Sequence, residues 1–432
     1  MNPLKSLTEK KQRGIYTGIP SYCTSNSTVI NSLLKYTAKS EGKLLLEATA
    51  NQVNQFGGYT GMKPGDFKKY IESMAAHSGV KAEQLLLGGD HLGPLIWKHE
   101  CERDAMEKAE ELVKEFAAAG FIKIHLDTSM CLGGDGGWVS KETVARRGVQ
   151  LYRAAIEGYE ERKRKVPHAI RPVFVIGSEV PVPGGSRNAG ERVNVTSPEE
   201  LKKTVQAYDK AFEEAGFENG MKDVIAVVVQ PGVEFGGNEV SVYQPERAKG
   251  LSEEIKLYEN LVLEGHSTDY QPPKALRKMV EDGVGVLKVG PALTFAMREA
   301  FFSLSDMEKI LIPKKEWADV PGVLEKTMKE YPDAWNQYYF GTEQELLLER
   351  KFSLSDRSRY YMGRREIRDA VKKLKENIDK SDPPLGLIDQ YFPGYTRSII
   401  EGTAGKTAED LIDFNILKVV RDYEYACTEQ RI

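Results

Sequence analysis

The stretch "LLLGGDHLGP", residues 85–94, shows the pattern from which the fold of this chain can be predicted. Its leucines indicate a buried β-strand, and the glycines and the proline that follow indicate a tight turn. Asp90 and His91 therefore stand where the strand ends. Seven further segments are also leucine-rich or β-branched and end in Gly, Asn, Asp or Ser, and they are residues 14–23, 43–52, 121–129, 171–179, 223–232, 260–267 and 283–290.

Helical patterns fit between these predicted strands. Residues 102–120 carry apolar side chains at three- and four-residue spacing, and residues 197–216 open with the capping box Ser197-x-x-Glu200. Both segments stop at glycine. Strands that alternate with helices predict a parallel sheet, and eight such units favour a closed (β/α)8 TIM barrel over the alternative, an open α/β sheet. A dinucleotide site is not indicated, because no G-x-G-x-x-G follows the first strand.

The last third of the chain has a different pattern. Residues 343–378 and 407–426 are typical of helices, and the Pro/Gly-rich residues 381–395 join them. We therefore predict two parts, a barrel over residues 1–302 and a C-terminal helical extension over residues 303–432 that packs on the barrel.

Composition excludes several classes of protein. The 60 Lys and Arg against 64 Asp and Glu leave a net charge of -4, which does not favour nucleic acid or an anionic membrane as a partner. No apolar run reaches the ~20 residues of a membrane span, and the polar N-terminus lacks the apolar region of a signal peptide. The four cysteines form no C-x-x-C pair, so neither a disulfide framework nor a thiolate zinc site is indicated. We expect a cytoplasmic enzyme or scaffold.

Polar side chains gather at the predicted strand ends, where a (β/α)8 barrel builds its active site. They are Asn51, Gln52, Asp90, His91, Asp127, Ser129, Glu179, Gln230, His266 and Asp269. Two histidines with a carboxylate and a further donor indicate a zinc or manganese site with an open position. The alternatives are that an Asp only caps the next helix and that a lone His is structural. We interpret His125 as structural and not as a residue of the site.

Four longer motifs resemble one known family over essentially the whole chain. "EATANQVNQFGGYTGMKPGDF" (47–67), "LLLGGDHLGP" (85–94), "AGFIKIHLDTSM" (119–130) and "FSLSDRSRYY" (352–361) are similar to the Z-type subunit family of tagatose-bisphosphate aldolase. Members are usually described as non-catalytic partners of a class II aldolase. Some resemble stand-alone sugar-phosphate 4-epimerases, and older descriptions call them tagatose 6-phosphate kinases. A kinase is not indicated by the residues, since phosphate-loop and kinase signatures are missing from the sequence.

The family is in turn similar to the metal-dependent class II aldolases, and this resemblance implies roles for the strand-end residues. It implies that Asp90 handles the proton on the C4 hydroxyl and that His91, Glu179 and His266 bind the metal. Gln230 stands where those enzymes have a further metal-binding histidine. A divalent cation follows, with Zn²⁺ expected and Mn²⁺, Ni²⁺ or Co²⁺ as alternatives. The glycine-rich phosphate loop of those enzymes is replaced here by "STDYQPP" (267–273).

Substrate-binding residues are expected from the same motifs. Cleaving the C3–C4 bond of a ketose phosphate and re-forming it inverts C4, and Asp90 with Asp127 or Asp269 could supply the two groups that move protons. Arg357 and Arg359 suit a 6-phosphate, because guanidinium groups bind phosphate through paired hydrogen bonds. The substrate-binding candidates are Glu47, Asn51, Gln55, Ser129, Asp269, Arg357 and Arg359.

The sequence favours one function and leaves two alternatives open. The favoured function is a metal-dependent C4 epimerase that interconverts fructose 6-phosphate and tagatose 6-phosphate. The alternatives are a non-catalytic stabilising subunit of tagatose-1,6-bisphosphate aldolase and a self-sufficient aldolase. The expected partners are a sugar phosphate, a catalytic class II aldolase subunit and further copies of the chain.

Overall fold

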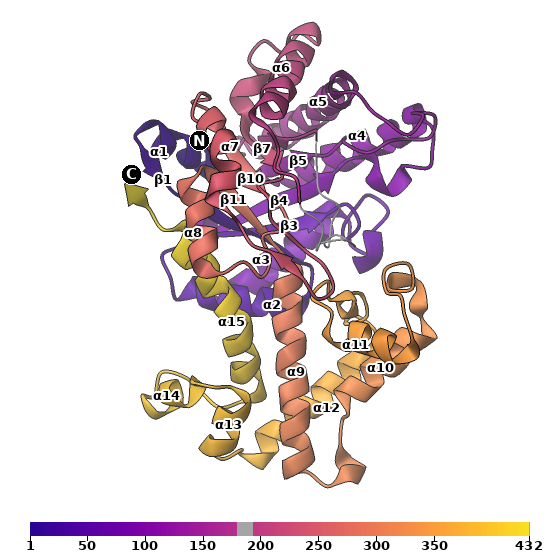
Figure 1. The fold of residues 1–432 in the computed structure, drawn as a ribbon, viewed down its shortest axis with the longest axis vertical. Coiled ribbons are helices and arrows are strands. Elements are labelled where there is room, and N and C mark those ends of the chain that lie inside the picture. The colour runs from indigo at the N-terminus through magenta and orange to yellow at the C-terminus, as the bar shows by residue number, and fades with distance from the viewer. Residues whose placement is uncertain (179–192, 432) are drawn as a thin grey trace.

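Eight parallel strands form a closed barrel in the computed structural model, which describes residues 1–178 and 193–431 (Figure 1). In the order in which they pair, the strands are β10 (Val262–Gly265), β11 (Val284–Val289), β2 (Ile19–Cys23), β3 (Leu44–Thr49), β4 (Leu85–Leu92), β5 (Lys123–Leu126), β6 (Val173–Ile176) and β7 (Val224–Val229). β7 pairs in turn with β10, which closes the ring. The predicted TIM barrel is confirmed, and the alternative of an open sheet is wrong.

The first predicted strand, residues 14–23, is divided in the structure. Its beginning, β1 (Ile15–Tyr16), pairs antiparallel with β12 (Gln430–Arg431), and only β2 joins the barrel. The break lies at Gly18, whose backbone N–H donates to the carbonyl of Cys427. A Cβ on Gly18 would lie 3.0 Å from the Cys427 sulfur, so the close approach of the C-terminal helix requires glycine here.

Helices cover the outside of the barrel between successive strands (Figure 1). They are α2 (Ser27–Ala38), α3 (Pro64–Ser78), α4 (Glu102–Ala119), α5 (Lys141–Lys165), α6 (Pro198–Glu214), α7 (Pro245–Ile255), α8 (Pro273–Glu281) and α9 (Pro291–Leu311). α4 and α6 confirm the two helices expected from the sequence. The Ser197 side chain accepts the N–H of Glu200, as the capping box predicts, and α4 ends at Gly120 with φ +98°.

The interior of the barrel is apolar at its N-terminal end. Leu4 and Leu7, on a short helical turn and on α1 (Ser6–Gln12), pack against the inward side chains of the strand starts. Leu45 on β3 and Val262 on β10 belong to this inner core. Two residues farther along the same strands the inward side chains are Glu47 and Glu264, so the interior becomes charged toward the C-terminal end.

The C-terminal third forms a set of helices beneath the barrel in Figure 1. They are α10 (Val320–Glu330), α11 (Glu343–Phe352), α12 (Arg365–Ser381), α13 (Leu385–Tyr391), α14 (Tyr395–Ile400) and α15 (Ala408–Cys427). The helical pattern over residues 343–378 forms two helices, α11 and α12, and a short 3-10 turn, Arg357–Tyr360, lies between them. α9 runs without a break across the predicted boundary at residue 302, and α15 packs on α8 and α9.

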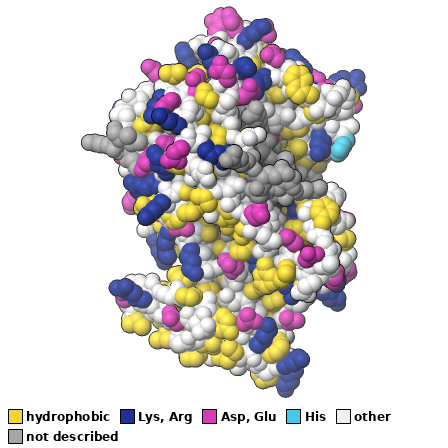
Figure 2. Space-filling view, viewed as in Figure 1, with side chains coloured by type: hydrophobic (Ala, Val, Ile, Leu, Met, Phe, Trp, Pro, Cys, Tyr) yellow, Lys and Arg dark blue, Asp and Glu magenta, His cyan; other side chains and the backbone are white. Residues whose placement is uncertain are grey.

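The surface carries charges of both signs. On the face shown in Figure 2, Lys and Arg side chains are mixed with Asp and Glu side chains. Among the described residues, no helix combines the length and the apolar composition that a membrane span requires.

Candidate active site

Nine buried polar side chains meet at the C-terminal end of the barrel, and none is more than 5% exposed. We call them the barrel-mouth cluster. They are Glu47 on β3, Asp90 and His91 on β4, Lys123 and His125 on β5, Asp127 directly after β5, Glu264 on β10, His266 directly after β10, and Lys288 on β11. Parallel strands bring these residues together because their carboxyl ends all lie at the same end of the barrel.

Two lysines hold the carboxylates of the cluster. The Lys123 ammonium lies 2.8 Å from a carboxylate oxygen of Glu47 and 2.8 Å from one of Glu264. Lys288 contacts Glu47 and lies 3.0 Å from Asp90. Buried charges of this kind persist only when they are paired. The pairs therefore fix the positions of the side chains at the bottom of the site.

Gly88 and Gly89 serve this packing. A Cβ on Gly88 would lie 2.7 Å from the Glu47 carboxylate, and one on Gly89 would lie 2.4 Å from Leu92. The space that these glycines leave is thus filled by side chains of the chain itself. Gly93 is required for another reason, because a Cβ there would lie 1.7 Å from the backbone oxygen of Asp127.

Asp90 is held in its ionised form. Burial opposes the charge, but His91 and Lys288 outweigh that effect and hold the pKa of Asp90 well below its ordinary value. Burial lowers the pKa of Lys288, but Asp90 and other neighbouring acidic groups outweigh this effect and raise that pKa well above the ordinary value. At neutral pH the site therefore presents an ionised carboxylate beside a fixed ammonium group.

His91 is fixed by a second carboxylate. Its Nδ1 lies 2.8 Å from Asp127, which in turn accepts a hydrogen bond of 2.8 Å from the Ser129 hydroxyl. Burial opposes the charge of Asp127, but the hydrogen bond from His91 prevails and holds its pKa below the ordinary value. The backbone of His91 has φ +47°, a left-handed conformation that costs about 1–3 kcal/mol outside glycine and is common at active sites.

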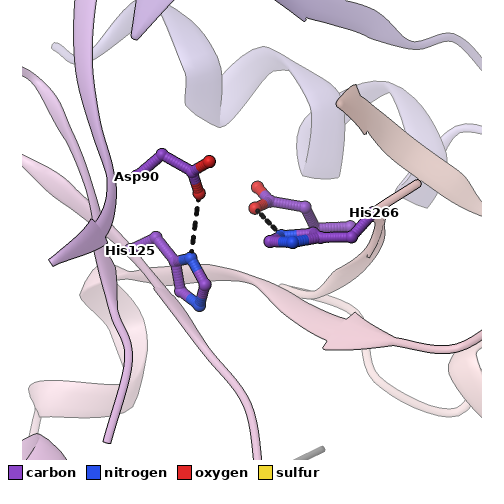
Figure 3. Close-up of side chains that lie close together, drawn as sticks. Asp90, His125 and His266 are labelled. Carbon is purple, nitrogen blue, oxygen red and sulfur yellow. Dashed lines mark hydrogen bonds and ion pairs between the residues drawn. The ribbon is translucent and has the colours of Figure 1, made fainter. Parts of the chain in front are cut away.

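A candidate metal centre lies between β4, β5 and β10. Asp90, His125, Glu264 and His266 each offer one ligand atom, and these atoms lie within 4.8 Å of one another. Figure 3 shows Asp90 and His125 pointing toward one another, with His125 Nδ1 3.1 Å from the carboxylate, and His266 beside them. His266 Nε2 lies 3.0 Å from Glu264. Burial lowers the pKa of His266 to about 4, which keeps its imidazole neutral and able to bind a metal.

The position of His125 corrects an expectation. Its ring centroid lies 5.3 Å from that of His266, so the side chain faces the site and is not a residue pointing away from it. The expectation was wrong because residues two apart in a strand share a face, and His125 and Asp127 are two apart. His125 Nε2 is buried and has no hydrogen-bond partner among the described residues. A buried imidazole nitrogen in this state fits a metal ion.

The charges of the cluster fit a divalent cation as well. Four carboxylates, Glu47, Asp90, Asp127 and Glu264, face two ammonium groups, Lys123 and Lys288. Burial opposes a positive charge on His91, but Asp90 and Asp127 outweigh that effect and raise its pKa above the ordinary value, so His91 offsets part of the excess negative charge. The carboxylates still outnumber the cations that face them, and a divalent cation would neutralise the remainder.

A cavity of about 120 Å³ opens above this centre and brings predicted residues together. Asn51, Asp90, His91, His266, Asp269 and Arg359 all line it. Tyr59 and Tyr360 form part of its wall, and Arg359 lies over the Tyr360 ring at 4.6 Å from the centroid. A larger groove of about 910 Å³ shares these three residues and runs along α12. Substrate can therefore reach the charged centre past an arginine.

Other predicted residues have different surroundings. The Gln55 amide donates to the carbonyl of Lys108, and the Gln230 amide oxygen accepts the N–H groups of Gly232 and Val233. The Arg357 guanidinium stacks on Tyr338 and donates to the carbonyl of Ala334. None of Gln55, Gln230 and Arg357 lines the cavity. Glu179 lies outside the described residues.

Sequence reasoning missed several residues of the site. Lys123, Glu264 and Lys288 are charged residues within predicted strands, and Cys23 ends β2 at the cavity wall. For Lys123, Glu264 and Lys288, a charge inside an otherwise apolar strand was the sequence signal that could have indicated a site residue. Such a charge must face a partner in the barrel interior, and only the fold identifies that partner.

Comparison with known proteins gives the family. The sequence profile of the family described as D-tagatose-1,6-bisphosphate aldolase subunit GatZ/KbaZ-like matches residues 4–428. The chain belongs to this GatZ/KbaZ-like family. The expected resemblance to Z-type subunits is thus confirmed over nearly the whole chain.

Relatives within the GatZ/KbaZ-like family match from end to end. A protein from Salmonella dublin, named D-tagatose-1,6-bisphosphate aldolase subunit GatZ, is 43% identical over 426 residues, which are 98% of this chain and 99% of the relative. A protein of the same name from Salmonella typhimurium is 43% identical over 425 residues, with the same shares. A crystal structure described as a probable tagatose 6 phosphate kinase from Sinorhizobium meliloti is 39% identical and has a TM-score of 0.87. The match covers 95% of this chain and 100% of the Sinorhizobium meliloti chain.

Proposed function

We propose that this chain is a subunit of tagatose-1,6-bisphosphate aldolase whose own barrel mouth is built for aldol chemistry on a ketose phosphate. The subunit role is supported by the names of relatives that match along the whole length. The chemical role is carried by one observation, the buried set of two histidines and two carboxylates whose ligand atoms lie within 4.8 Å of one another. A purely structural subunit has no need of such a set.

The donor set indicates which metal would bind. Asp90, His125, Glu264 and His266 would hold it, with His91 beside them. Two imidazole nitrogens and two carboxylate oxygens favour Zn²⁺, with Mn²⁺, Ni²⁺ and Co²⁺ as alternatives. When bound, such a cation acts as a Lewis acid that stabilises negative charge on the sugar oxygens as the C3–C4 bond breaks.

The side chains of the chain itself perform the remaining tasks. Asp90 accepts the proton of the C4 hydroxyl on the carboxylate oxygen that does not hold the metal, since its carboxylate is ionised and lines the cavity. Its two oxygens have different neighbours, because Oδ1 faces Lys288 and His125 while Oδ2 lies 3.4 Å from the Cys23 sulfur. Arg359 binds the phosphate with charge-assisted hydrogen bonds.

C4 epimerisation is the second candidate function. If the bond re-forms on the other face of the aldehyde before release, fructose 6-phosphate and tagatose 6-phosphate interconvert. This outcome requires that both fragments stay beside Asp90, which lines a cavity of about 120 Å³. Asp127 would act on the second face through His91, to which it is joined, because His91 lines the cavity. A self-sufficient aldolase would instead release the two fragments.

One set of assays separates these functions. The purified chain is supplied with Zn²⁺ or Mn²⁺ and given fructose 6-phosphate, tagatose 6-phosphate or tagatose 1,6-bisphosphate, first alone and then with a catalytic class II aldolase subunit. Interconversion of the monophosphates by the chain alone supports the epimerase, and triose phosphate release from the bisphosphate supports the aldolase. A longer half-life of the catalytic subunit supports the partner role.

Variants identify the site responsible. Asp90→Asn should abolish any sugar turnover, whereas Asp306→Asn, which alters an exposed carboxylate on α9, should leave it unchanged. Full turnover by Asp90→Asn would show that the barrel mouth is not the reacting site. The effect of the chain on a catalytic subunit should survive Asp90→Asn, because that role depends on the surface.

A further inference from the structure

Asp269 occupies an unusual position in the cavity. It lies in the loop after β10, and its Oδ1 accepts the backbone N–H groups of Gly290 and Ala292 at 3.0 and 2.8 Å. These two N–H groups stand at the start of α9, whose first residue, Pro291, has no N–H. Asp269 is 3% exposed and lines the cavity beside Arg359. A carboxylate of this chain thus holds the free N–H groups at the beginning of a long helix.

This location is where a (β/α)8 barrel commonly binds a phosphate. The N–H groups and the dipole of a helix N-terminus attract anions, and the loops after the seventh and eighth strands often complete a phosphate site. β10 and β11 are the seventh and eighth barrel strands in chain order, and α9 follows β11 directly. Asp269 therefore occupies, at the start of α9, a position of the kind where such barrels bind phosphate.

We propose that Asp269 is a specificity-determining residue that excludes a phosphate from this side of the cavity, so that the site accepts ketose monophosphates and rejects bisphosphates. The inference rests on the proposed function for the sugar-phosphate class alone. If Asp269 excludes the second phosphate, the substrate of this subunit differs from tagatose 1,6-bisphosphate, the sugar in the names of its relatives.

The loop holds the carboxylate in place. Ser267 and Tyr270 have φ +53° and +62°, left-handed conformations that persist only where the surroundings impose them. The Tyr270 hydroxyl donates to the carbonyl of Leu354, and its ring packs edge-on against Phe235 and Phe295. These contacts fix the backbone next to Asp269, and the hydrogen bonds from Gly290 and Ala292 hold its carboxylate. It is also ionised above pH 6, since burial raises its pKa to about 6.

In the part of the chain that the structure describes, one lysine and one arginine line the cavity, Lys288 and Arg359, and only Arg359 is available to bind a phosphate. Lys288 is already paired with Glu47 and Asp90. Arg359 donates to the backbone carbonyls of Ser355 and Asp356 and, among the described residues, is in no ion pair with a carboxylate. A single phosphate can therefore bind Arg359, whereas a second one would meet the Asp269 carboxylate.

Binding measurements test this inference without turnover. Isothermal titration calorimetry with fructose 6-phosphate and with fructose 1,6-bisphosphate gives the ratio of the two Kd values for the whole chain. We expect the wild type to bind the monophosphate at least about tenfold more tightly, because like charges brought together in a buried site repel strongly. Asp269→Asn removes the charge and Asp269→Ala also frees the N–H groups, so bisphosphate affinity should rise about tenfold in the first and further in the second.

A matched control is Asp319→Asn, since Asp319 also caps a helix, α10, but lies outside the cavity. Its Kd ratio should equal that of the wild type. Equal affinity of the wild type for both sugars, or an unchanged ratio in both Asp269 variants, overturns the inference and leaves the proposed function standing. Failure of the wild type to bind either sugar contradicts the proposed function and this inference with it.

Discussion

Replacing Lys123 by methionine should destabilise the barrel strongly. Lys123 is fully buried and lies 2.8 Å from both Glu47 and Glu264, which are also fully buried. Burial lowers the pKa of Lys123, but Glu264 and Glu47 outweigh that effect and raise it above the ordinary value. Without the Lys123 ammonium group, the buried carboxylates of Glu47 and Glu264 each lose one cationic partner. Because breaking a buried ion pair costs about 3–5 kcal/mol, the free energy of unfolding of Lys123→Met should fall by that amount.

Urea denaturation followed by circular dichroism measures this change. The matched control is Lys249→Met, whose lysine is 73% exposed and pairs at 3.8 Å with Glu253 one helical turn away. An exposed pair contributes little, so the control should change the free energy of unfolding by less than about 0.5 kcal/mol. A loss below about 1 kcal/mol in Lys123→Met would refute the reasoning, since it would mean that the two carboxylates carry no charge in the folded protein.

A double variant checks the cause. Glu264→Gln removes one of the charges that Lys123→Met leaves unpaired. The variant with both changes should therefore be more stable than Lys123→Met alone, with an interaction free energy of about 1–3 kcal/mol in the cycle. Simple addition of the two single effects would show that lost packing, and not charge, explains the instability.

Three further results are expected. Burial raises the pKa of Asp269 from 3.8 to about 6, so its charge destabilises the folded protein above pH 6 and ceases to do so as the pH falls toward 3.8. In urea denaturation, Asp269→Asn should therefore be more stable than the wild type at pH 7.5, by at most about 3 kcal/mol, and should lose this advantage near pH 4. His125→Ala and His266→Ala should each lose a bound divalent metal, measured by mass spectrometry of the dialysed protein, and full metal content in both would place the metal elsewhere. Arg359→Met should raise the KM for a sugar phosphate about 10–100-fold with a smaller effect on kcat, whereas Arg365→Met, which alters an exposed arginine, should change neither.

Much of the fold could be predicted because it depends on local patterns. Each barrel strand is a short apolar run with a turn at its end, and α4 and α6 carry their own start and stop signals. The division of residues 14–23 into β1 and β2 could not be predicted, because its cause is the approach of Cys427 from the far end of the chain.

The candidate site was predicted less completely, for a related reason. The sequence by itself determined that polar residues such as Asp90, His91 and His266 stand at strand ends, where the fold class places an active site. Only the tertiary structure decided that His125 faces His266 and that the Gln230 amide oxygen accepts the N–H of Gly232 in the turn after β7. A ligand or an ion pair is a relation between strands that lie far apart in the chain. Closing the barrel creates these relations, and no local pattern of residues contains them.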